Sequence, residues 1–388
     1  MRVCIARNAE ARTNAAIARV ANALNDGGHD PYLLTRNRFI YGCGRVRKLK
    51  YSLTDKEIIN YEIVLKSEPG RGFINIFQLL LYQCIVFIWF ITNRDKYEII
   101  HAFDLDTGLP ALISCILTKK KYVYHIADFY IDSHVLIPKV LKQIIRRIEY
   151  LVINRSNTTI ICTEKRSKQI AGSRPNNLVI VHNTPSISRE LITSYIEENK
   201  NNEELKREVV FTYVGALSEN RFIRIAINVI KRYPMITLNL AGMGVLSDYV
   251  KEAAKEYSNI NYYGIIDYDK ALRLYSQTDF MFAVYDPIVP NHKYCAPNKV
   301  YEAMALGKPI IVARGTGIDR IVSDNKMGVV IEYSEKAFEK LIEKIKEGKL
   351  DIKSLSHNSQ KAYDRYSWEE MKKRIANIYN NLEFTFFI

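Results

Sequence analysis

The stretch Ala296–Ala313 reads APNKVYEAMALGKPIIVA, and its pattern predicts a loop, a short helix and a buried strand. Lys299–Leu306 has apolar residues at helical spacing, and Gly307 is the residue type that ends a helix in a left-handed conformation. The apolar run Ile310–Ala313 then predicts a buried strand. A helix followed at once by a buried strand is typical of an α/β protein with a parallel sheet.

The start of this helix has features that suit an anion. A loop-to-helix junction offers unpaired backbone N–H groups and the positive end of a helix dipole, which favour a phosphate. Lys299 adds a positive charge, and Glu302, one turn further on, is an acceptor placed to bind a pair of sugar hydroxyls. The spacing fits equally well a basic loop and an amphipathic helix with one solvated glutamate.

Apolar strands alternate with helical stretches throughout the chain, as in a mostly parallel sheet flanked by helices. The hydrophilic stretch Ser186–Arg207 indicates a junction between two halves, and ligands of such sheets bind beyond the carboxyl ends of the strands. A helix is predicted over residues 13–25. We predict strands near Arg2–Ile5, Pro31–Leu34, Ile99–His101, Tyr122–His125, Thr159–Cys162, Leu178–Val181, Val209–Val214, Ile236–Leu240, Ile260–Tyr263, Met281–Val284, Ile310–Ala313 and Val329–Ile331.

Composition narrows the class of protein. A chain of 388 residues with 48% hydrophobic residues can form two domains, each with its own core. The six cysteines lie far apart, without a CxxC pair or a Cys/His cluster, so we expect neither disulfides nor a metal site. The N-terminus reads MRVCIARNAE, a strand rather than a signal peptide, which predicts a cytoplasmic protein. Neither GxGxxG nor a Walker lysine motif is present.

The positive charge is concentrated in the first half. Residues 1–185 hold 27 Lys and Arg against 15 Asp and Glu, so +12 of the net charge of +14 lies there. Nucleic acid, a phosphorylated lipid, a membrane surface or a solvated basic face would each account for it. Phe73–Thr92 is long enough to span a bilayer but falls between two predicted strands, which favours a buried or membrane-dipping helix. Val135–Ile153 predicts a basic amphipathic helix that either rests on anionic lipid or packs as a domain helix. Together with the basic residues between Arg36 and Lys50, these segments favour a membrane, and no nucleic-acid motif is present.

The motif Pro297–Glu302, PNKVYE, resembles the donor-binding segment of the family 4 glycosyltransferases, in the subgroup that reads P-N-K-x-x-E. Tyr213–Leu217, Leu238–Gly244 and Tyr366–Glu369 resemble further motifs of that family in the family's order. The resemblance implies a GT-B fold of two doubly wound Rossmann-like domains facing a central cleft. It also implies a retaining transferase that takes a UDP- or GDP-linked sugar as co-substrate, with no other cofactor and no metal.

The family's donor residues fall on several positions of this chain. Glu302 would hold the ribose hydroxyls, and Pro297, Asn298 and Lys299 would approach the diphosphate or the sugar. Arg221 falls near the family's diphosphate-binding arginine, and Gly215 lies in the family's first glycine turn.

The chain departs from the family pattern at three places near these residues. Where a lysine usually follows the arginine, only Arg224 is available, and we hypothesise that Lys299 supplies that charge. Tyr294 stands where many members have an earlier glutamate, whose role passes to backbone groups or Asp286, or is not needed. The turn at Gly242 is either a tight turn or a phosphate contact.

Acceptor activation is expected in the first half of the chain. Relatives often show Asp-x-His-Asp after the strand Tyr122–His125, and here only Asp128 falls on that pattern. Asp128 is therefore the first catalytic candidate and His125 the second, with His134 as a further residue in this region. Arg12, Asn14, His101 and Asp104 are candidates for the acceptor or the cleft, and a structural histidine is the other interpretation of His101.

These inferences predict four segments: residues 1–185, a domain facing acceptor and membrane; 186–207, a junction; 208–365, the nucleotide-sugar domain; and 366–388, a helix crossing back. The expected function is sugar transfer to a lipid-linked or glycan acceptor in cell-surface polysaccharide or glycolipid assembly, at the inner face of the cell membrane. Two alternatives are a GT-B nucleotide-sugar epimerase and a non-catalytic module that binds anionic lipid.

Overall fold

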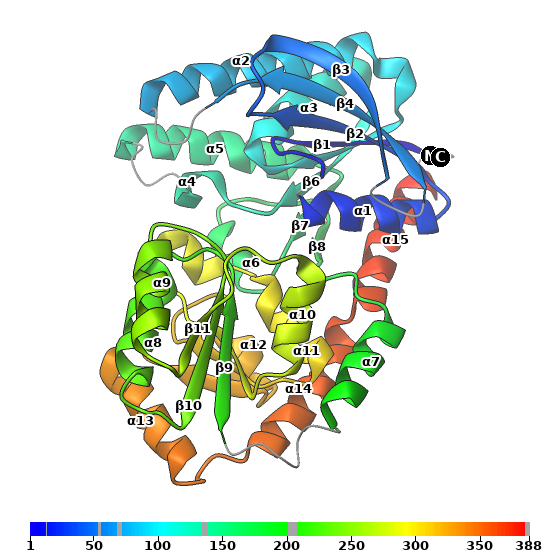
Figure 1. Cartoon of the computed structure of the whole chain (residues 1–388). Coiled ribbons are helices and arrows are strands. Elements are labelled where there is room, and N and C mark those ends of the chain that lie inside the picture. The colour runs from blue at the N-terminus through cyan, green and yellow to red at the C-terminus, as the bar shows by residue number, and fades with distance from the viewer. Residues whose placement is uncertain (13, 53–55, 68–71, 134–137, 201–207, 385–388) are drawn as a thin grey trace. The chain divides into compact units, whose positions relative to one another are not determined.

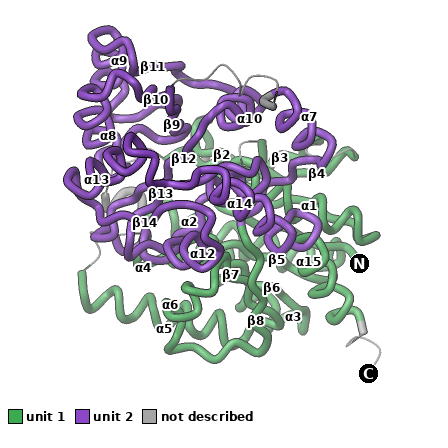
Figure 2. Tube along the Cα trace, turned by 90° about the horizontal axis from the view of Figure 1, so that it is seen from below, with its two compact units in different colours: residues 1–182, 371–388 green, residues 183–370 purple. Residues whose placement is uncertain are grey.

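A computed structural model describes residues 1–12, 14–52, 56–67, 72–133, 138–200 and 208–384. The chain divides into two compact units, Met1–His182 with Met371–Ile388, and Asn183–Glu370 (Figure 2). Each unit contains a sheet of its own with helices packed on it (Figure 1). The predicted α/β class with two Rossmann-like sheets is confirmed.

Unit 1 contains an eight-stranded sheet in the order β3-β4-β2-β1-β5-β6-β7-β8. All neighbours pair in parallel except β3 and β4, which pair antiparallel. The strands are β1 (Arg2–Arg7), β2 (Asp30–Asn37), β3 (Cys43–Ser52), β4 (Glu57–Leu65), β5 (Ile99–Phe103), β6 (Lys121–Ile126), β7 (Thr158–Ile161) and β8 (Leu178–Ile180). The helices are α1 (Ala15–Asp26), α2 (Gly72–Thr92), α3 (Asp104–Thr118), α4 (Tyr130–Ser133), α5 (Lys139–Arg155), α6 (Arg166–Gln169) and α15 (Trp368–Phe384), which begins in unit 2, with a 3-10 turn at Arg94–Lys96.

Strands β3 and β4 were not predicted, because β3 is rich in lysine and arginine. As the edge strand of the sheet it tolerates charge, which also protects an exposed edge from pairing with other chains. Arg47 of β3 contacts Glu62 of β4, and Tyr51 donates a hydrogen bond to the same carboxylate at 3.3 Å. Part of the basic cluster between Arg36 and Lys50 therefore has a structural role.

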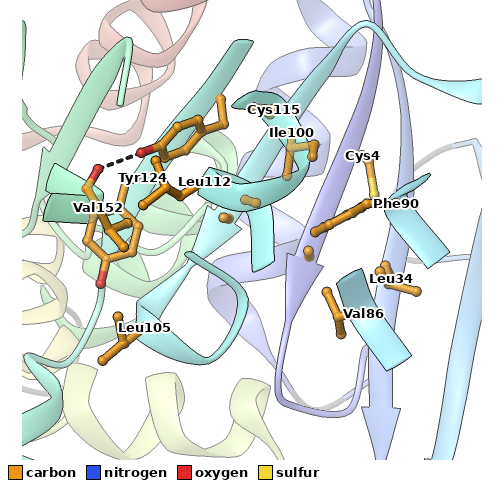
Figure 3. Packing of buried hydrophobic residues seen from close by; sticks show 14 of the residues in the cluster. Cys4, Leu34, Val86, Phe90, Ile100, Leu105, Leu112, Cys115, Tyr124 and Val152 are labelled. Carbon is orange, nitrogen blue, oxygen red and sulfur yellow. Dashed lines mark hydrogen bonds between the residues drawn. The ribbon is translucent and has the colours of Figure 1, made fainter. Parts of the chain in front are cut away.

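The core of unit 1 lies between the sheet and α2, α3 and α5. Leu34, Ile100 and Tyr124 of the strands meet Phe90 of α2 and Leu112 of α3, all buried (Figure 3). Burying such large side chains supplies most of the favourable free energy of folding.

Helix α2, for which a buried or membrane-dipping helix was expected, is buried on one face and exposed on the other. Trp89 and Phe90 pack on the sheet, whereas Phe77, Leu80 and Ile88 are exposed. Within the described ranges, no helix combines the length and apolar character needed to cross a membrane.

Helix α5 differs from the predicted amphipathic pattern. Its polar residue Glu149 is completely buried, whereas Val140, Leu141 and Ile144 of the predicted apolar stripe are exposed. Glu149 is accommodated because it accepts a hydrogen bond of 2.9 Å from the hydroxyl of Tyr124. The apolar stripe of α5 is therefore shared between the core and the surface.

Unit 2 contains a six-stranded, fully parallel sheet in the order β11-β10-β9-β12-β13-β14. Its strands are β9 (Val209–Val214), β10 (Ile236–Ala241), β11 (Ile260–Tyr262), β12 (Phe280–Ala283), β13 (Ile310–Ala313) and β14 (Gly328–Ile331). Its helices are α7 (Arg189–Lys200), α8 (Ile223–Ile230), α9 (Ser247–Glu256), α10 (Tyr268–Ser276), α11 (Asn298–Leu306), α12 (Asp319–Asp324), α13 (Glu335–Lys346) and α14 (Ile352–Tyr366), with 3-10 turns at Glu219–Arg221 and Pro290–Tyr294.

The stretch Ala296–Ala313 folds as predicted. Helix α11 covers Asn298–Leu306, Gly307 ends it with a φ of 60°, and β13 covers Ile310–Ala313. The helix is almost wholly buried, including Glu302, which is 5% exposed. A carboxylate at this depth requires hydrogen-bonding partners, which excludes the solvated glutamate considered above.

Candidate functional site

Three glycine turns meet at the carboxyl ends of β9, β10 and β11. Gly215 donates its N–H to the carbonyl of Ala241, and Gly242 donates to the carbonyl of Gly264 at 2.7 Å. A Cβ on Gly242 would lie 1.9 Å from the carbonyl oxygen of Gly215, so only glycine allows this approach. Gly242 is thus needed for the turn itself.

Lys299, in the first turn of α11, extends over the turn at Gly215. Its Nζ lies 4.8 Å from the ring centroid of Tyr213 and 3.0 Å from where a Cβ on Gly215 would stand. The cation therefore lies at the carboxyl edge of the sheet, beside the turn that follows β9.

Arg221 is the second cation at this edge. Its guanidinium lies 3.9 Å from the ring centroid of Tyr285, which comes shortly after the end of β12. Burial raises the pKa of the Tyr285 phenol, and the positive charge of Arg221 lowers it in part. The charges of Lys299 and Arg221 both act on Tyr213, so the two cations share one neighbourhood.

Arg224 is already neutralised by a carboxylate. Its guanidinium makes three hydrogen bonds of 2.9–3.0 Å to Glu219 and lies over the ring of Tyr249. Lys299 and Arg221, in contrast, form no ion pair with any carboxylate in the part of the chain that the structure describes. Of the cations considered, these two retain an uncompensated charge.

Glu302 lies beneath this edge among tyrosines. Its Oε1 accepts a hydrogen bond of 3.1 Å from the hydroxyl of Tyr268 at the start of α10. Its charge also acts on Tyr275 and Tyr285 and raises the pKa of both phenols, after the larger effect of burial. Tyr275 in turn bonds the backbone N–H and carbonyl of Val214, which connects Glu302 to the end of β9.

The remaining donor candidates lie in the segment that leads into α11. Pro297 is the residue before the helix, and Asn298 is its half-buried first residue. No side chain caps this helix start, so its backbone N–H groups are directed toward the loop. Tyr294 ends a 3-10 turn and is half-buried, and Asp286 accepts a hydrogen bond of 2.9 Å from Ile288 N–H.

A second site is a cavity of about 230 Å³ in unit 1, at the carboxyl ends of β1, β5 and β6. It brings together the candidates Asn14, Asp104 and Asp128 with residues that the sequence analysis missed. Its lining is Arg7, Asn8, Ala9, Asn14, Arg38, Asp104, Asp106, Asp128 and Tyr130.

Asp104 organises the wall of this cavity. Its Oδ1 accepts hydrogen bonds from the backbone N–H groups of Ala127 at 2.8 Å and Asp128 at 2.9 Å. Asp104 has a φ of 55°, an unfavourable conformation for a non-glycine residue that often marks a functional site. Burial raises the pKa of its carboxyl to about 6, although the nearby Arg7 lowers it. Asp128 itself is exposed to solvent.

His125 and His101 lie in the interior instead. One ring nitrogen of His101 and one of His125 are joined by a hydrogen bond of 3.1 Å. The other ring nitrogen of His101 forms a hydrogen bond of 2.6 Å with the hydroxyl of Tyr379 in α15. Burial lowers the pKa of both histidines, that of His101 to about 3, so both are neutral at pH 7. This environment favours a structural role for His101, and it argues against His125 as a proton acceptor.

Arg12, Asn14 and His134 complete the residues predicted for unit 1. Arg12 is exposed and lies over the ring of Tyr51. Asn14 caps α1 by accepting from Ile17 N–H at 3.2 Å, and it also accepts from Arg7 at 2.9 Å. His134 lies outside the described residues.

Two kinds of site residue could not be recognised from the sequence motifs. Arg7 ends β1, Asn8 follows it, and Asp106 lies in the first turn of α3 just after β5. The neighbouring carboxyl ends of β1 and β5 are the signal that could have identified them. The tyrosines around Glu302 carry no motif and could be recognised only from their contacts. No group of three metal-binding side chains occurs among the residues that the structure describes.

Part of this chain matches a known protein family. The family model of the "Glycosyl transferases group 1" matches residues 195–365. An uncharacterized glycosyltransferase of Methanocaldococcus jannaschii is 25% identical over 240 residues, which cover 56% of this chain and 57% of that relative. This chain thus matches little more than half the length of that relative.

Two solved structures share the fold over nearly the whole chain. Sucrose-phosphate synthase from Thermosynechococcus elongatus is similar with a TM-score of 0.75 and 14% identity, covering 99% of this chain and 100% of that one. Anabaena HepE, solved in complex with UDP, is similar with a TM-score of 0.69 and 17% identity, covering 98% and 100%. The matched residues 195–365 contain Arg221, Lys299 and Glu302. Residues 195–365 of this chain therefore match the group 1 glycosyl transferases, and the chain as a whole has the fold of these solved structures.

Proposed function

We propose that this protein transfers a sugar, with retention of anomeric configuration, from a UDP- or GDP-linked donor to a lipid-linked or glycan acceptor. The observation that carries the proposal is the grouping of two uncompensated cations, Lys299 and Arg221, with the buried acceptor Glu302. A nucleoside diphosphate has complementary groups, since its diphosphate is anionic and its ribose presents a pair of hydroxyl donors.

The donor site would act on the leaving group. Departure of the nucleoside diphosphate develops negative charge, which preorganised cations and helix N-termini stabilise. Lys299, Arg221 and the first N–H groups of α11 supply that stabilisation in this proposal. Glu302 holds the ribose, which fixes the diphosphate relative to the cations.

The acceptor would enter through unit 1. In the proposal Asp128 orients the acceptor hydroxyl and takes its proton, and Asp104 fixes Asp128 by holding its backbone N–H. Arg7, Asn8 and Arg38 supply donors for the oxygen-rich end of such an acceptor. The cavity's mix of carboxylates, amide and guanidinium groups matches a polyhydroxylated ligand.

Membrane association of unit 1 would present a lipid-linked acceptor. Helix α2 packs on α3 and α3 packs on α5, and their outer sides form an apolar face. That face consists of Phe77, Leu80, Ile88, Ile113, Ile116, Leu117, Val140, Leu141 and Ile144. Lys139, Arg146 and Arg147 of α5 are exposed beside it, as on segments that bind anionic lipid. The proposal therefore places the enzyme at the inner face of the cell membrane, in the assembly of cell-surface polysaccharide or glycolipid.

Vesicle flotation tests this membrane contact. The protein should float with vesicles that contain phosphatidylglycerol and remain in solution with phosphatidylcholine alone. The double variant Val140→Ser/Ile144→Ser should lose flotation, whereas Ile288→Ser, at an exposed apolar site in unit 2, should not. Equal flotation of the double variant would contradict the assignment of this face.

A panel of UDP- and GDP-sugars tests the enzymatic proposal. The true donor should raise the melting temperature, because a ligand that binds only the folded state stabilises it. With a suitable acceptor, the product should carry the donor's anomeric configuration. Release of an epimerised donor without transfer would identify an epimerase. A melting temperature that no UDP- or GDP-sugar of the panel raises would contradict a nucleotide-sugar site.

A further inference from the structure

Two aromatic rings lie beneath the two uncompensated cations, and neither has a role in the proposed donor site so far. Lys299 lies over Tyr213, and Arg221 lies over Tyr285, at 4.8 Å and 3.9 Å from the ring centroids. Tyr213 is completely buried in β9, and Tyr285 is nearly so. Since the surrounding core fixes both rings, they offer each cation a rigid support.

A tyrosine face holds a cation differently from a carboxylate. The ring's quadrupole attracts the positive charge without neutralising it, so the cation keeps its full affinity for an anion. Arg224 shows the contrast, because Glu219 compensates its charge although Tyr249 also supports it. The site thus retains the charge of Lys299 and Arg221 and restricts only their positions.

Tyr213 also shapes the turn that lies under Lys299. Its hydroxyl donates a hydrogen bond of 2.8 Å to the carbonyl of Ala216, the residue after Gly215. The same side chain therefore fixes the cation through its ring and the glycine turn through its hydroxyl. These two contributions can be separated by substitution, since phenylalanine keeps the ring and removes the hydroxyl.

We propose that Tyr213 is a positioning residue for the donor diphosphate, which it serves by holding the ammonium of Lys299 on its ring face, with Tyr285 in the same role for Arg221. The inference rests on the proposed function, because it assigns the cations to a nucleotide diphosphate. The preorganised pair loses little conformational freedom when the anion binds, which strengthens binding.

Titrations of the full-length protein test this role, with UDP and GDP as diphosphate probes and uridine and guanosine as phosphate-free controls. Tyr213→Leu should weaken diphosphate binding about tenfold, the effect of losing one partly desolvated cation–π contact. Binding of the nucleosides should change little, and Tyr213→Phe should restore most of the loss. In a Lys299→Met background, Tyr213→Leu should have little further effect.

Tyr249→Leu provides the matched control, since it removes a ring from beneath the ion-paired Arg224 and should leave UDP and GDP binding unchanged. Wild-type affinity in Tyr213→Leu, or a parallel loss of nucleoside and diphosphate binding, would overturn the positioning role. The proposed function would then still stand. If the wild-type protein bound neither UDP nor GDP, the proposed function would fail instead, and this inference with it.

Discussion

The hydroxyl of Tyr268 donates a hydrogen bond to Oε1 of Glu302 over 3.1 Å, so an exposed phenol is one partner of the buried carboxylate. Tyr268 begins α10 and Glu302 lies in α11, two helices of unit 2 that pack on each other. A carboxylate can accept about four hydrogen bonds, so this contact alone does not saturate it. Glu302 is thus oriented before a ligand arrives, which favours tight binding of a pair of hydroxyls.

The two uncompensated cations should control diphosphate binding. We expect Arg221→Met and Lys299→Met each to weaken UDP or GDP binding about 10- to 100-fold, because each removes a charged hydrogen-bond donor. Arg224→Met should change the affinity by no more than about twofold, since Glu219 already neutralises Arg224. Titration calorimetry measures the UDP and GDP affinities of all three variants. A loss in Arg224→Met as large as in Lys299→Met would mean that Arg224 supplies the family's second cation.

Asp128 and Asp104 should affect turnover and not donor binding. Asp128→Asn should lower kcat about 100-fold or more, because it removes the proposed proton acceptor, with the affinity for UDP or GDP unchanged. Initial rates of sugar transfer and a parallel titration separate the two effects. Unchanged turnover in Asp128→Asn would exclude it as the base.

The raised pKa of Asp104 gives a pH dependence that can be measured. Its carboxylate is the stronger acceptor for the N–H groups of Ala127 and Asp128, and the pKa of about 6 means that it forms as the pH rises through 6. We therefore expect kcat/KM to increase through pH 6 in the wild-type enzyme. Asp104→Asn should remove this inflection. The same inflection in the variant would assign it to another group.

Glu149 should make the stability of unit 1 decrease as the pH rises. Burial raises the pKa of this carboxyl to about 8, so the folded state binds a proton that the unfolded state releases above its ordinary pKa of 4.5. The contribution of the protonated Glu149 to the stability of the folded state is fully present below about pH 4.5 and is lost as the pH rises toward 8. Relative to Glu149→Gln, the wild-type protein should lose about 2–4 kcal/mol between pH 5 and pH 8. Urea unfolding of both proteins at these pH values measures this difference, and parallel behaviour would show that Glu149 is ionised when folded.

Gly242 and Gly264 should differ sharply in their tolerance of alanine. Gly242→Ala places a Cβ 1.9 Å from the carbonyl oxygen of Gly215 and should cost about 3 kcal/mol, with loss of UDP or GDP binding. Gly264 has a φ of 63° but no atom within 4 Å of a Cβ, so Gly264→Ala should cost only about 1 kcal/mol. The urea unfolding midpoints of the two variants and the wild-type protein measure these costs. Equal costs would place the effect in the backbone conformation alone.

Local patterns were sufficient for most of the fold. Apolar runs such as Ile310–Ala313 are short and bounded by Gly and Pro, so the six strands of unit 2 could be predicted to within about a residue. The edge strand β3 could not, because an edge strand accepts lysine and arginine that resemble a solvated basic segment. The burial of Glu149 could not be predicted either, since its partner Tyr124 is distant in sequence.

Residues of the candidate site could be predicted from the sequence only where they belong to a motif. Glu302 and Lys299 lie in one stretch with a recognisable spacing, and the structure brings both to the carboxyl edge of the sheet. Tyr213 lies in β9 and Tyr285 just after β12, and only the parallel packing of these two strands makes both tyrosines neighbours of the donor residues.

The most direct test of the donor site is whether Glu302 recognises the ribose. The affinity of wild-type protein and of Glu302→Ala should be measured for UDP and GDP and for their 2′,3′-dideoxy analogues. We predict that removing both hydroxyls weakens wild-type binding about 10- to 100-fold, because a buried carboxylate loses two donors. In Glu302→Ala the natural and dideoxy ligands should bind equally. Undiminished discrimination in Glu302→Ala, or none in the wild-type protein, would contradict the assignment of Glu302 to the ribose of a nucleotide sugar.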